Sequence, residues 1–179
     1  MGQIKPPKRA KLFCGLLSAD EDLLAETRRR LPAFFGTIDL VSDMWPFDST
    51  DYYALEMGEE IKRQFVFFEA LVSVERLAAV KRLTNDLEAK LCDDLVLPHE
   101  RRPVNIDPGY MTLSKFVLAT TKDYSHRIYV QRGIYAEVTL HYESGGWRAW
   151  PWTYPDYAGD TYHAFFNQAR EVYKRQLQE

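Results

Sequence analysis

The feature that most constrains the fold is the order of strand-like and helix-like segments in the first half of the chain. Residues 11–17 are almost continuously apolar, as in a buried strand, and a helical pattern extends from there to about residue 31. Alternating apolar residues predict a second strand at residues 38–44, and residues 63–71 predict a further one. A long amphipathic helix follows Ser73. This order predicts an α+β fold built on a ferredoxin-like split βαβ sheet.

Local signals define the ends of these segments. Ser18 and Glu21 have the spacing of a capping box, which predicts the start of the first helix. Pro32 and Gly36 end that helix. Residues 52–57 are predicted to form another strand. An α+β sandwich with a different connectivity would fit the same order of elements.

The second half of the chain has a different character. Residues 116–120, 124–130 and 134–142 predict strands with short connections, which would extend the sheet as a β-meander. From about Asp160, aromatic and aliphatic residues at helical spacing predict a C-terminal helix that docks on the sheet.

Length and composition point to a single α+β domain over residues 1–179, because a chain with 46% hydrophobic residues can bury one sizeable core. No run approaches the roughly 20 apolar residues of a membrane span. Cys14 and Cys92 lie in apolar or helical patterns where thiols usually pack, so no disulfide is expected. We therefore expect a cytoplasmic protein with no membrane partner.

A hairpin around Gly133 contains the most informative pattern of polar residues. A three-residue loop at residues 131–133, with glycine in the left-handed conformation, is a common hairpin solution. Such a loop fixes the register, which pairs Val130 with Ile134, Tyr129 with Tyr135, Arg127 with Glu137, Ser125 with Thr139 and Asp123 with His141. His126 would then lie on the apolar face, where a histidine is more often a core residue than a catalytic one. The Arg127–Glu137 pair belongs either to a site or to a structural ion pair.

This polar face does not predict a metal site. Glu137 and His141 are four residues apart on one strand, which separates their Cα atoms by about 13 Å, too far for ligands each about 2.1 Å from one ion. Asp123 and His141 are closer across the strands, but two ligands make a weak case. No Cys or His spacing resembles a zinc motif.

A second polar feature lies at residues 105–110. Pro108 and Gly109 suit the central positions of a type II turn, which Asp107 would open and Tyr110 would follow. Because Asn105 and Asp107 are two residues apart in an extended segment, their side chains should project to the same side. The pair either contributes to a site or stabilises the turn.

A third feature brings Lys122, His126 and Arg127 together with neighbouring hydroxyl groups. Such groups can hold a phosphate, but they also fit an ordinary charged surface loop. The chain has no phosphate-binding loop of the form G-x-x-x-x-G-K-[ST], no dinucleotide fingerprint and no nucleophile elbow.

An aromatic tract follows the meander. It contains Trp147, Trp150, Trp152, Tyr154 and Tyr157. These rings can stack on a base or sugar, or they can cover the edge of the sheet and supply core area.

The chain resembles a family of uncharacterised prokaryotic proteins, DUF4416, over nearly its whole length. The resemblance is carried by residues 11–16, 56–58, 105–110, 121–127, 133–140 and 152–157. Members are sometimes labelled GTP-binding, but this chain lacks the phosphate-binding loop, and Thr121-Lys122-Asp123 lacks the spacing of a guanine-specificity motif. The resemblance implies that the polar residues gathered by the predicted hairpin form a site.

Two functions from different classes fit these patterns. The first is a small enzyme or binding protein for a phosphate-bearing ligand, either a nucleotide or a phosphorylated metabolite. Lys122, Arg127 and a protonated His126 would hold the anion, and Asp107 or Glu137 would act as a base or Mg²⁺ ligand. Asn105 would orient the ligand. The remaining predicted ligand-binding residues are Tyr110 and Trp152.

The alternative is a non-catalytic adaptor that binds RNA or a protein partner through the aromatic tract and the basic N-terminus. The net charge of −3 argues against a general nucleic-acid binder, which usually has a basic excess. A third possibility is a structural subunit whose aromatic surfaces mediate assembly.

Overall fold

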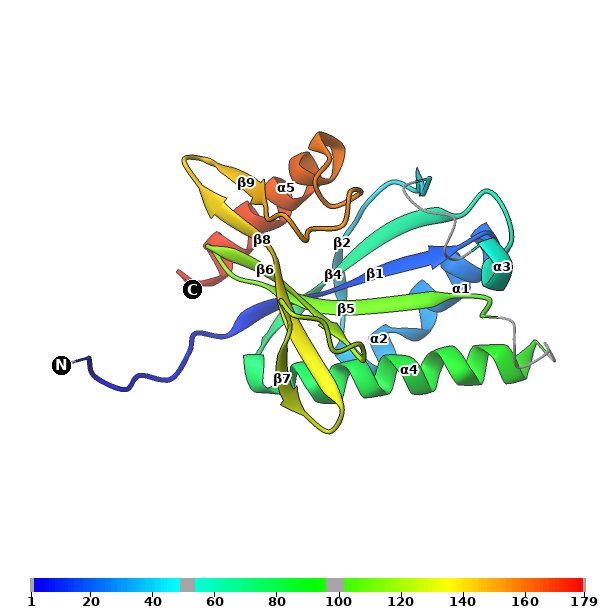
Figure 1. Ribbon diagram of the computed structural model, residues 1–179, viewed down its shortest axis with the longest axis horizontal. Coiled ribbons are helices and arrows are strands. Elements are labelled where there is room, and N and C mark those ends of the chain that lie inside the picture. The colour runs from blue at the N-terminus through cyan, green and yellow to red at the C-terminus, as the bar shows by residue number, and fades with distance from the viewer. Residues whose placement is uncertain (1, 49–53, 96–101, 179) are drawn as a thin grey trace.

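The computed structural model describes residues 2–48, 54–95 and 102–178, and its main feature is one nine-stranded sheet (Figure 1). β1 (Ala10–Ser18) lies in the middle, between β4 (Lys62–Val72) and β5 (Asn105–Met111). β2 (Ile38–Val41) and β3 (Trp45–Pro46) pair with the far side of β4.

Beyond β5 the sheet continues through the second half of the chain. β6 (Lys115–Thr120) pairs with β8 (Ile134–Glu143), which in turn pairs with β7 (Ile128–Gln131) and β9 (Gly146–Ala149). Every one of these pairs is antiparallel. The predicted α+β class is therefore confirmed, as is the extension of the sheet by later strands. The predicted β-meander is wrong, because β6 pairs with β8 and not with β7, the next strand in the chain.

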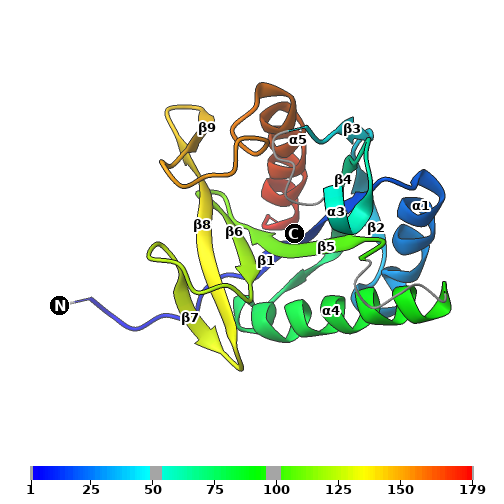
Figure 2. The same ribbon diagram turned by 45° about the vertical axis from the view of Figure 1, so that its right-hand side comes forward.

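The helices lie on both faces of the sheet (Figure 2). They are α1 (Glu21–Arg30), α2 (Pro32–Phe35), α3 (Ala54–Met57), the 3₁₀ helix η2 (Val74–Arg76), α4 (Leu77–Asp94) and α5 (Asp160–Gln176). The predicted docking of the C-terminal helix is confirmed by the buried rings of α5. No helix in the described part of the chain is long and apolar enough to cross a membrane.

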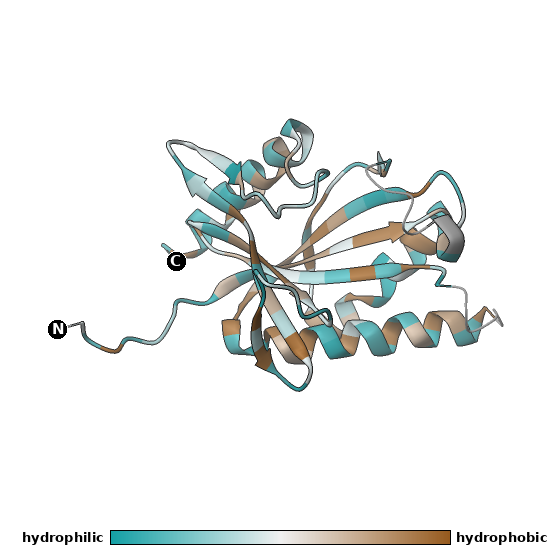
Figure 3. Cartoon of the chain, in the orientation of Figure 1, coloured by the Kyte–Doolittle hydropathy of each residue, from teal (hydrophilic) through white to brown (hydrophobic). Residues whose placement is uncertain are grey.

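The two faces of the sheet have different cores. Leu12, Cys14 and Leu16 of β1 pack among aliphatic residues from α1 and α4, together with Phe35 of α2. Phe13 points the other way, into an aromatic cluster with α5, β9 and Tyr157. Because both faces are covered, β1 is buried along its whole length, which explains its continuous apolar run (Figure 3).

Two local predictions are wrong, one on the type of an element and one on the cap of a helix. Residues 54–57 form helix α3 instead of a strand, while the rest of the predicted segment at 52–57 lies outside the described residues. The cap of α1 is Asp20, whose Oδ1 accepts from the backbone N–H groups of Asp22 and Leu23 at 2.9 and 3.1 Å. Ser18 cannot serve as that cap because its backbone still belongs to β1 and its hydroxyl donates to Pro103 O.

The predicted turn at residues 105–110 is also wrong, because this segment is strand β5. Gly109 is required by packing: a Cβ there would lie 2.3 Å from Val117 O and 2.4 Å from the Phe13 ring. Pro108 pairs with Cys14, and β6 pairs with β5 only from Gly109 onward. The proline therefore stands where the second ladder has not begun, a position that tolerates its missing N–H.

The predicted hairpin forms, but its loop and most of its predicted pairs differ from the expectation. Tyr129 pairs with Tyr135, as expected, but the loop has two residues, Arg132 and Gly133, both with positive φ. A register shift lets Gln131 instead of Val130 pair with Ile134.

The first strand of this hairpin begins at Ile128, because a turn closes there with Arg127 N–H donating to Tyr124 O at 2.9 Å. The expected pairs of Ser125 with Thr139 and Asp123 with His141 therefore do not form. β9 takes that edge of β8, and Arg148 pairs with His141.

Candidate functional site

The sheet divides between β5 and β6, and a cavity of about 320 Å³ opens in the division. The two strands pair only from Gly109 to Met111, so the first half of β5 separates from the end of β6 (Figures 1 and 2). We call this cavity the fork pocket. It is lined by Phe47, Arg63, Lys81, Arg102, Asn105, Asp107, Leu118, Ala119, Thr120, Thr121, Lys122, Tyr124, Glu137, Tyr154, Pro155, Asp156 and Tyr157.

Asp107 lies between two cationic side chains of this pocket. Its Oδ2 accepts from Asn105 Nδ2 at 2.5 Å and lies 3.5 Å from Arg63 Nη1, while its Oδ1 lies 3.5 Å from Lys81 Nζ. Burial alone would raise the pKa of this carboxyl, but Lys81, Arg63 and Arg102 outweigh it, so the pKa lies below its ordinary value. Asp107 is therefore ionised at neutral pH.

Arg63 reaches the pocket from β4 and is almost fully buried. Its Nη2 donates to Asp156 Oδ2 at 3.2 Å, and its guanidinium lies over the rings of Phe47, Phe65 and Tyr157. Within the described residues, Arg63 Nε, Arg63 Nη1 and Tyr157 Oη are buried without a hydrogen bond. This end of the pocket is polar but incompletely satisfied.

Lys81 reaches the same place from α4, on the other face of the sheet. Its Nζ donates to Ile106 O at 3.0 Å, through the gap that β6 leaves beside the first half of β5. Glu88 is a buried acid on the same helix, and it accepts hydrogen bonds from Ile106 N–H at 2.7 Å and from Arg102 at 2.6 Å. Burial raises the pKa of Glu88, because it outweighs the attraction of Lys81 and Arg102.

The opposite side of the pocket is held by a second charged cluster, centred on Glu137 of β8. Its Oε2 accepts from Arg127 Nε at 2.8 Å and contacts His126 Nε2 at 3.2 Å, and its Oε1 accepts from Thr139 at 3.2 Å. Arg127 also donates to Tyr154 Oη at 2.8 Å and to Lys122 O at 3.2 Å. The buried polar groups of Glu137 and Arg127 therefore all have hydrogen-bond partners within the protein.

A stack of four rings borders this cluster. Trp152 lies between His126 and Trp150, with centroid distances of 5.5 and 5.3 Å and interplanar angles of 14° and 8°. His141 covers the far side of Trp150 at 4.2 Å. Each tryptophan therefore contacts two neighbouring rings, although about 37% and 39% of Trp150 and Trp152 stay exposed.

Comparison with family models matches residues 8–173 to the Domain of unknown function (DUF4416). The chain belongs to the DUF4416 family. The resemblance seen in the sequence is confirmed. No curated protein and no solved structure matched the chain.

This DUF4416 chain brings most of the predicted site residues together. Asn105, Asp107, Lys122 and Glu137 line the fork pocket, and Arg127 stands directly behind Glu137 and Tyr154. The prediction that Asn105 and Asp107 project to the same side is confirmed, although a strand and not a turn is responsible.

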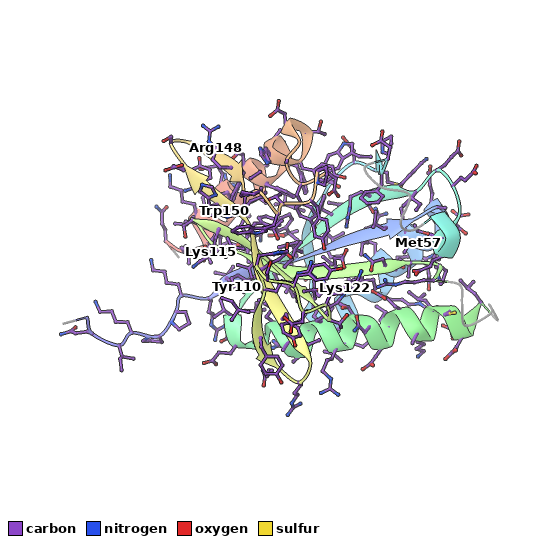
Figure 4. All side chains as sticks on the ribbon, in the orientation of Figure 1. Met57, Tyr110, Lys115, Lys122, Arg148 and Trp150 are labelled. Atoms are coloured by element: carbon purple, nitrogen blue, oxygen red, sulfur yellow. The ribbon has the colours of Figure 1, made fainter. Side chains whose placement is uncertain are left out.

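Three predicted site residues, His126, Trp152 and Tyr110, do not line the fork pocket. His126 contacts Glu137 and Trp152 instead of lying on an apolar face, because the chain has not yet entered β7. Trp152 belongs to the ring stack, where its Nε1 donates to Val138 O at 3.1 Å. Tyr110 packs against the buried cluster that includes Leu77 and Val117, and its side chain projects from β5 to the side opposite Asp107. Figure 4 shows Trp150 beside β9 and Lys122 near the middle of the molecule.

Sequence reasoning missed four of the charged lining residues, which are Arg63, Lys81, Arg102 and Asp156. Two of them, Lys81 and Arg63, have a signal in the sequence. Lys81 falls on the buried stripe of α4, as does Glu88. Arg63 alternates with Phe65 and Phe67 on the inward side of β4. A charged residue at a core position of an amphipathic pattern needs a polar partner and therefore marks a site. Among the described residues, no cluster of three or more His, Cys, Asp or Glu could hold a metal ion.

Proposed function

We propose that the fork pocket binds a small phosphate-bearing ligand, either a nucleotide or a phosphorylated metabolite. The observation that carries this proposal is the convergence of four cationic side chains on one cavity: Arg63 from β4, Lys81 from α4, Arg102 from before β5 and Lys122 from after β6. Three carboxylates, Asp107, Glu137 and Asp156, share the lining, and Glu88 of α4 pairs with Arg102 at 2.6 Å. Phosphate groups are bound by such charge-assisted hydrogen bonds.

The size and walls of the pocket support a small ligand. A volume of about 320 Å³ is near the lower end of the range of about 300–1,000 Å³ for small-molecule sites. Phe47, Tyr124 and Tyr154 add aromatic surface beside the charged groups. These properties favour a sugar phosphate or a nucleoside monophosphate over a dinucleotide.

The predicted catalytic residues differ in what they can do. Asp107 contacts the cavity, but a carboxylate with a lowered pKa is a weak general base, which favours a role in holding the ligand or an associated Mg²⁺. Glu137 is fully engaged by Arg127, His126 and Thr139, which favours a positioning role. Ligand binding is therefore better supported than any particular reaction.

We also propose a finer description of the fold and its setting. The strand order β2-β4-β1-β5, with α1 and α4 packed on one face, supports a ferredoxin-like split βαβ unit in the first half of the chain. The buried free thiol of Cys14 fits a reducing, cytoplasmic compartment. The family resemblance favours a prokaryotic source.

The test is a thermal-shift screen of the purified protein against nucleotides, sugar phosphates and short RNAs, each with and without Mg²⁺. A ligand that binds only the folded protein raises the melting temperature. We expect a phosphorylated ligand to raise it, and the Lys122→Met and Lys81→Met variants to lose that shift. Lys90→Met is the matched control, because Lys90 is exposed on the same helix as Lys81 and does not line the pocket. A shift that survives in both pocket variants would contradict the proposal.

A non-catalytic adaptor that binds RNA or a protein partner remains the alternative proposal, and the same screen tests for RNA binding. The partial exposure of Trp150, Trp152 and Tyr154 favours it. However, each tryptophan already contacts two neighbouring rings, which reduces the ring surface left for a base to stack on. Lys11 of the basic N-terminus is buried and donates to Asp39 at 2.6 Å, so it cannot contact a nucleic acid. A shift with RNA alone would favour the adaptor.

A further inference from the structure

Two buried side chains that line the fork pocket have polar atoms without a hydrogen-bond partner. In the described part of the chain, Arg63 Nε, Arg63 Nη1 and Tyr157 Oη make no hydrogen bond, although both residues are more than nine-tenths buried. A buried donor without an acceptor is costly, and such an atom in a native protein needs an explanation, for example a bound ion or ligand group.

The two side chains approach each other over Gly15 of β1. A Cβ on Gly15 would lie 2.9 Å from Arg63 Nη1 and 3.2 Å from Tyr157 Oη, so both atoms border the same point. Gly15 pairs with Asp107 on the adjacent strand, and Asp107 Oδ2 lies 3.5 Å from Arg63 Nη1. A guanidinium, a phenol and a carboxylate therefore meet in one small region of the pocket.

Each of these three groups has a definite hydrogen-bonding role. Burial raises the pKa of Tyr157 well above its ordinary value of 10.0, so the phenol keeps its proton and can donate. Burial would also raise the pKa of Asp107, but Lys81, Arg63 and Arg102 hold it below its ordinary value, so the carboxylate is ionised and only accepts. The guanidinium of Arg63 only donates. The region therefore combines donors from two residues with one acceptor.

An oxyanion that still has a proton matches this combination. Arg63 and Tyr157 can donate to its unprotonated oxygens, and Asp107 can accept the hydrogen bond from its remaining P–OH group. Inorganic phosphate keeps at least one proton at neutral pH, and a phosphate monoester takes one up near about pH 6. Sulfate has no proton in this range, so one of its oxygens would face the ionised Asp107 without a hydrogen bond.

Asp107 has more freedom to move than Asp156, the other carboxylate beside Arg63. The Asp107 side chain is 27% exposed, compared with 7% for Asp156. Its contacts with Arg63 and Lys81 are both 3.5 Å, longer than the usual hydrogen bond of about 2.7–3.2 Å. A small shift of Asp107 would make room for an anion beside Arg63 Nη1, while the bond from Asn105 Nδ2 would keep the carboxylate nearby.

From this arrangement we infer that Arg63, Tyr157 and Asp107 form a subsite for a protonated phosphate group. The inference rests on the proposed function and adds to it the class of anion: the pocket takes inorganic phosphate or a phosphate monoester and rejects sulfate and its esters. Asp107 sets this specificity, because it accepts from the proton that sulfate lacks and repels an anion without one.

The first experiment is isothermal titration calorimetry of the unaltered protein with inorganic phosphate and with sulfate, which share a tetrahedral shape and have nearly the same size. We expect phosphate to bind at least tenfold more tightly. Equal affinities would overturn the inference and leave the proposed function intact. Failure of inorganic phosphate to bind would overturn the inference alone if a phosphorylated ligand still raises the melting temperature, and the proposed function as well if none does.

Tyr157→Phe tests the donor role. Because Tyr157 Oη has no hydrogen bond in the described part of the chain, its removal should leave the free energy of unfolding unchanged or raise it, while the affinity for phosphate falls at least tenfold. Tyr173→Phe is the matched control: its Oη donates to Arg9 O at 2.7 Å away from the fork pocket, so it should lower stability and change the affinity less than twofold. An unchanged affinity in Tyr157→Phe would overturn the inference.

Asp107→Asn tests the acceptor role. The amide of asparagine can donate to either anion, so phosphate and sulfate should bind this variant within about threefold of each other. An undiminished preference for phosphate would show that Asp107 does not accept the proton and would overturn the inference. If this variant fails to fold, the comparison of the two anions on the unaltered protein and on Tyr157→Phe still decides.

Discussion

Two buried arginines of this protein are surrounded by similar groups but are satisfied to different degrees. Arg127 donates to Glu137, Tyr154 and Lys122 O, which occupies its guanidinium on all sides. Arg63 donates to Asp156 and lies near Asp107, yet two of its nitrogens have no hydrogen bond within the described residues. The two clusters form opposite sides of one pocket.

The difference teaches how to separate a structural ion pair from a candidate ligand site. A buried polar network that is complete adds rigidity, while a buried donor without a partner costs free energy until something binds it. The sequence pattern predicts that Arg127 binds the ligand, and it does not identify Arg63 as a site residue. The geometry instead favours a structural role for Arg127 and a ligand-facing role for the cluster around Arg63.

The largest effect is expected from breaking the complete cluster. Glu137→Ala would leave Arg127 buried without its carboxylate, so we expect the free energy of unfolding to fall by about 3–5 kcal/mol. Urea denaturation measures this change. Glu143→Ala is the control, because that side chain is 69% exposed and should change stability by less than about 0.5 kcal/mol. A loss below about 1 kcal/mol for Glu137→Ala would refute the structural role.

A smaller effect is expected from crowding the incomplete cluster. In Gly15→Ala, the new Cβ would lie 2.9 Å from Arg63 Nη1 and 3.2 Å from Tyr157 Oη. The guanidinium must move, so we expect a stability loss of about 1–3 kcal/mol and a reduced thermal shift with the phosphorylated ligand. Gly146→Ala is the matched control, since nothing lies within 4 Å of its added Cβ. Equal stability and equal thermal shifts of the two variants would show that Arg63 can move aside without cost.

The smallest effect is expected in the dependence of stability on acidic pH. Burial would raise the pKa of Asp107, but Lys81, Arg63 and Arg102 hold it below its ordinary value of 3.8. A carboxyl with a lowered folded-state pKa stabilises the fold above the unfolded-state value, and this contribution is lost as the pH falls through the folded-state value. The urea midpoint of Asp107→Asn should therefore fall less between about pH 5 and about pH 2 than that of the unaltered protein. Identical pH profiles would contradict this role of Asp107.

Elements whose pattern is local were predicted well. The helical spacing of Tyr162, Phe166 and Tyr173 defined α5, and the alternation of period two placed Asn105 and Asp107 on one side of β5. Prediction failed where the same residues suit two structures. Pro108 and Gly109 are typical of a turn, but here the close approach of Phe13 and Val117 demands the glycine within a strand.

The sequence by itself determined the fold class, the docking helix, the family and the shared side of Asn105 and Asp107. Only the tertiary structure decided that Arg63, Lys81, Arg102 and Lys122 meet. These four come from separate elements, and they converge because β1 pairs with β4 on one side and β5 on the other, while β5 separates from β6 before Gly109. That arrangement depends on backbone pairing between distant segments, which no local periodicity encodes.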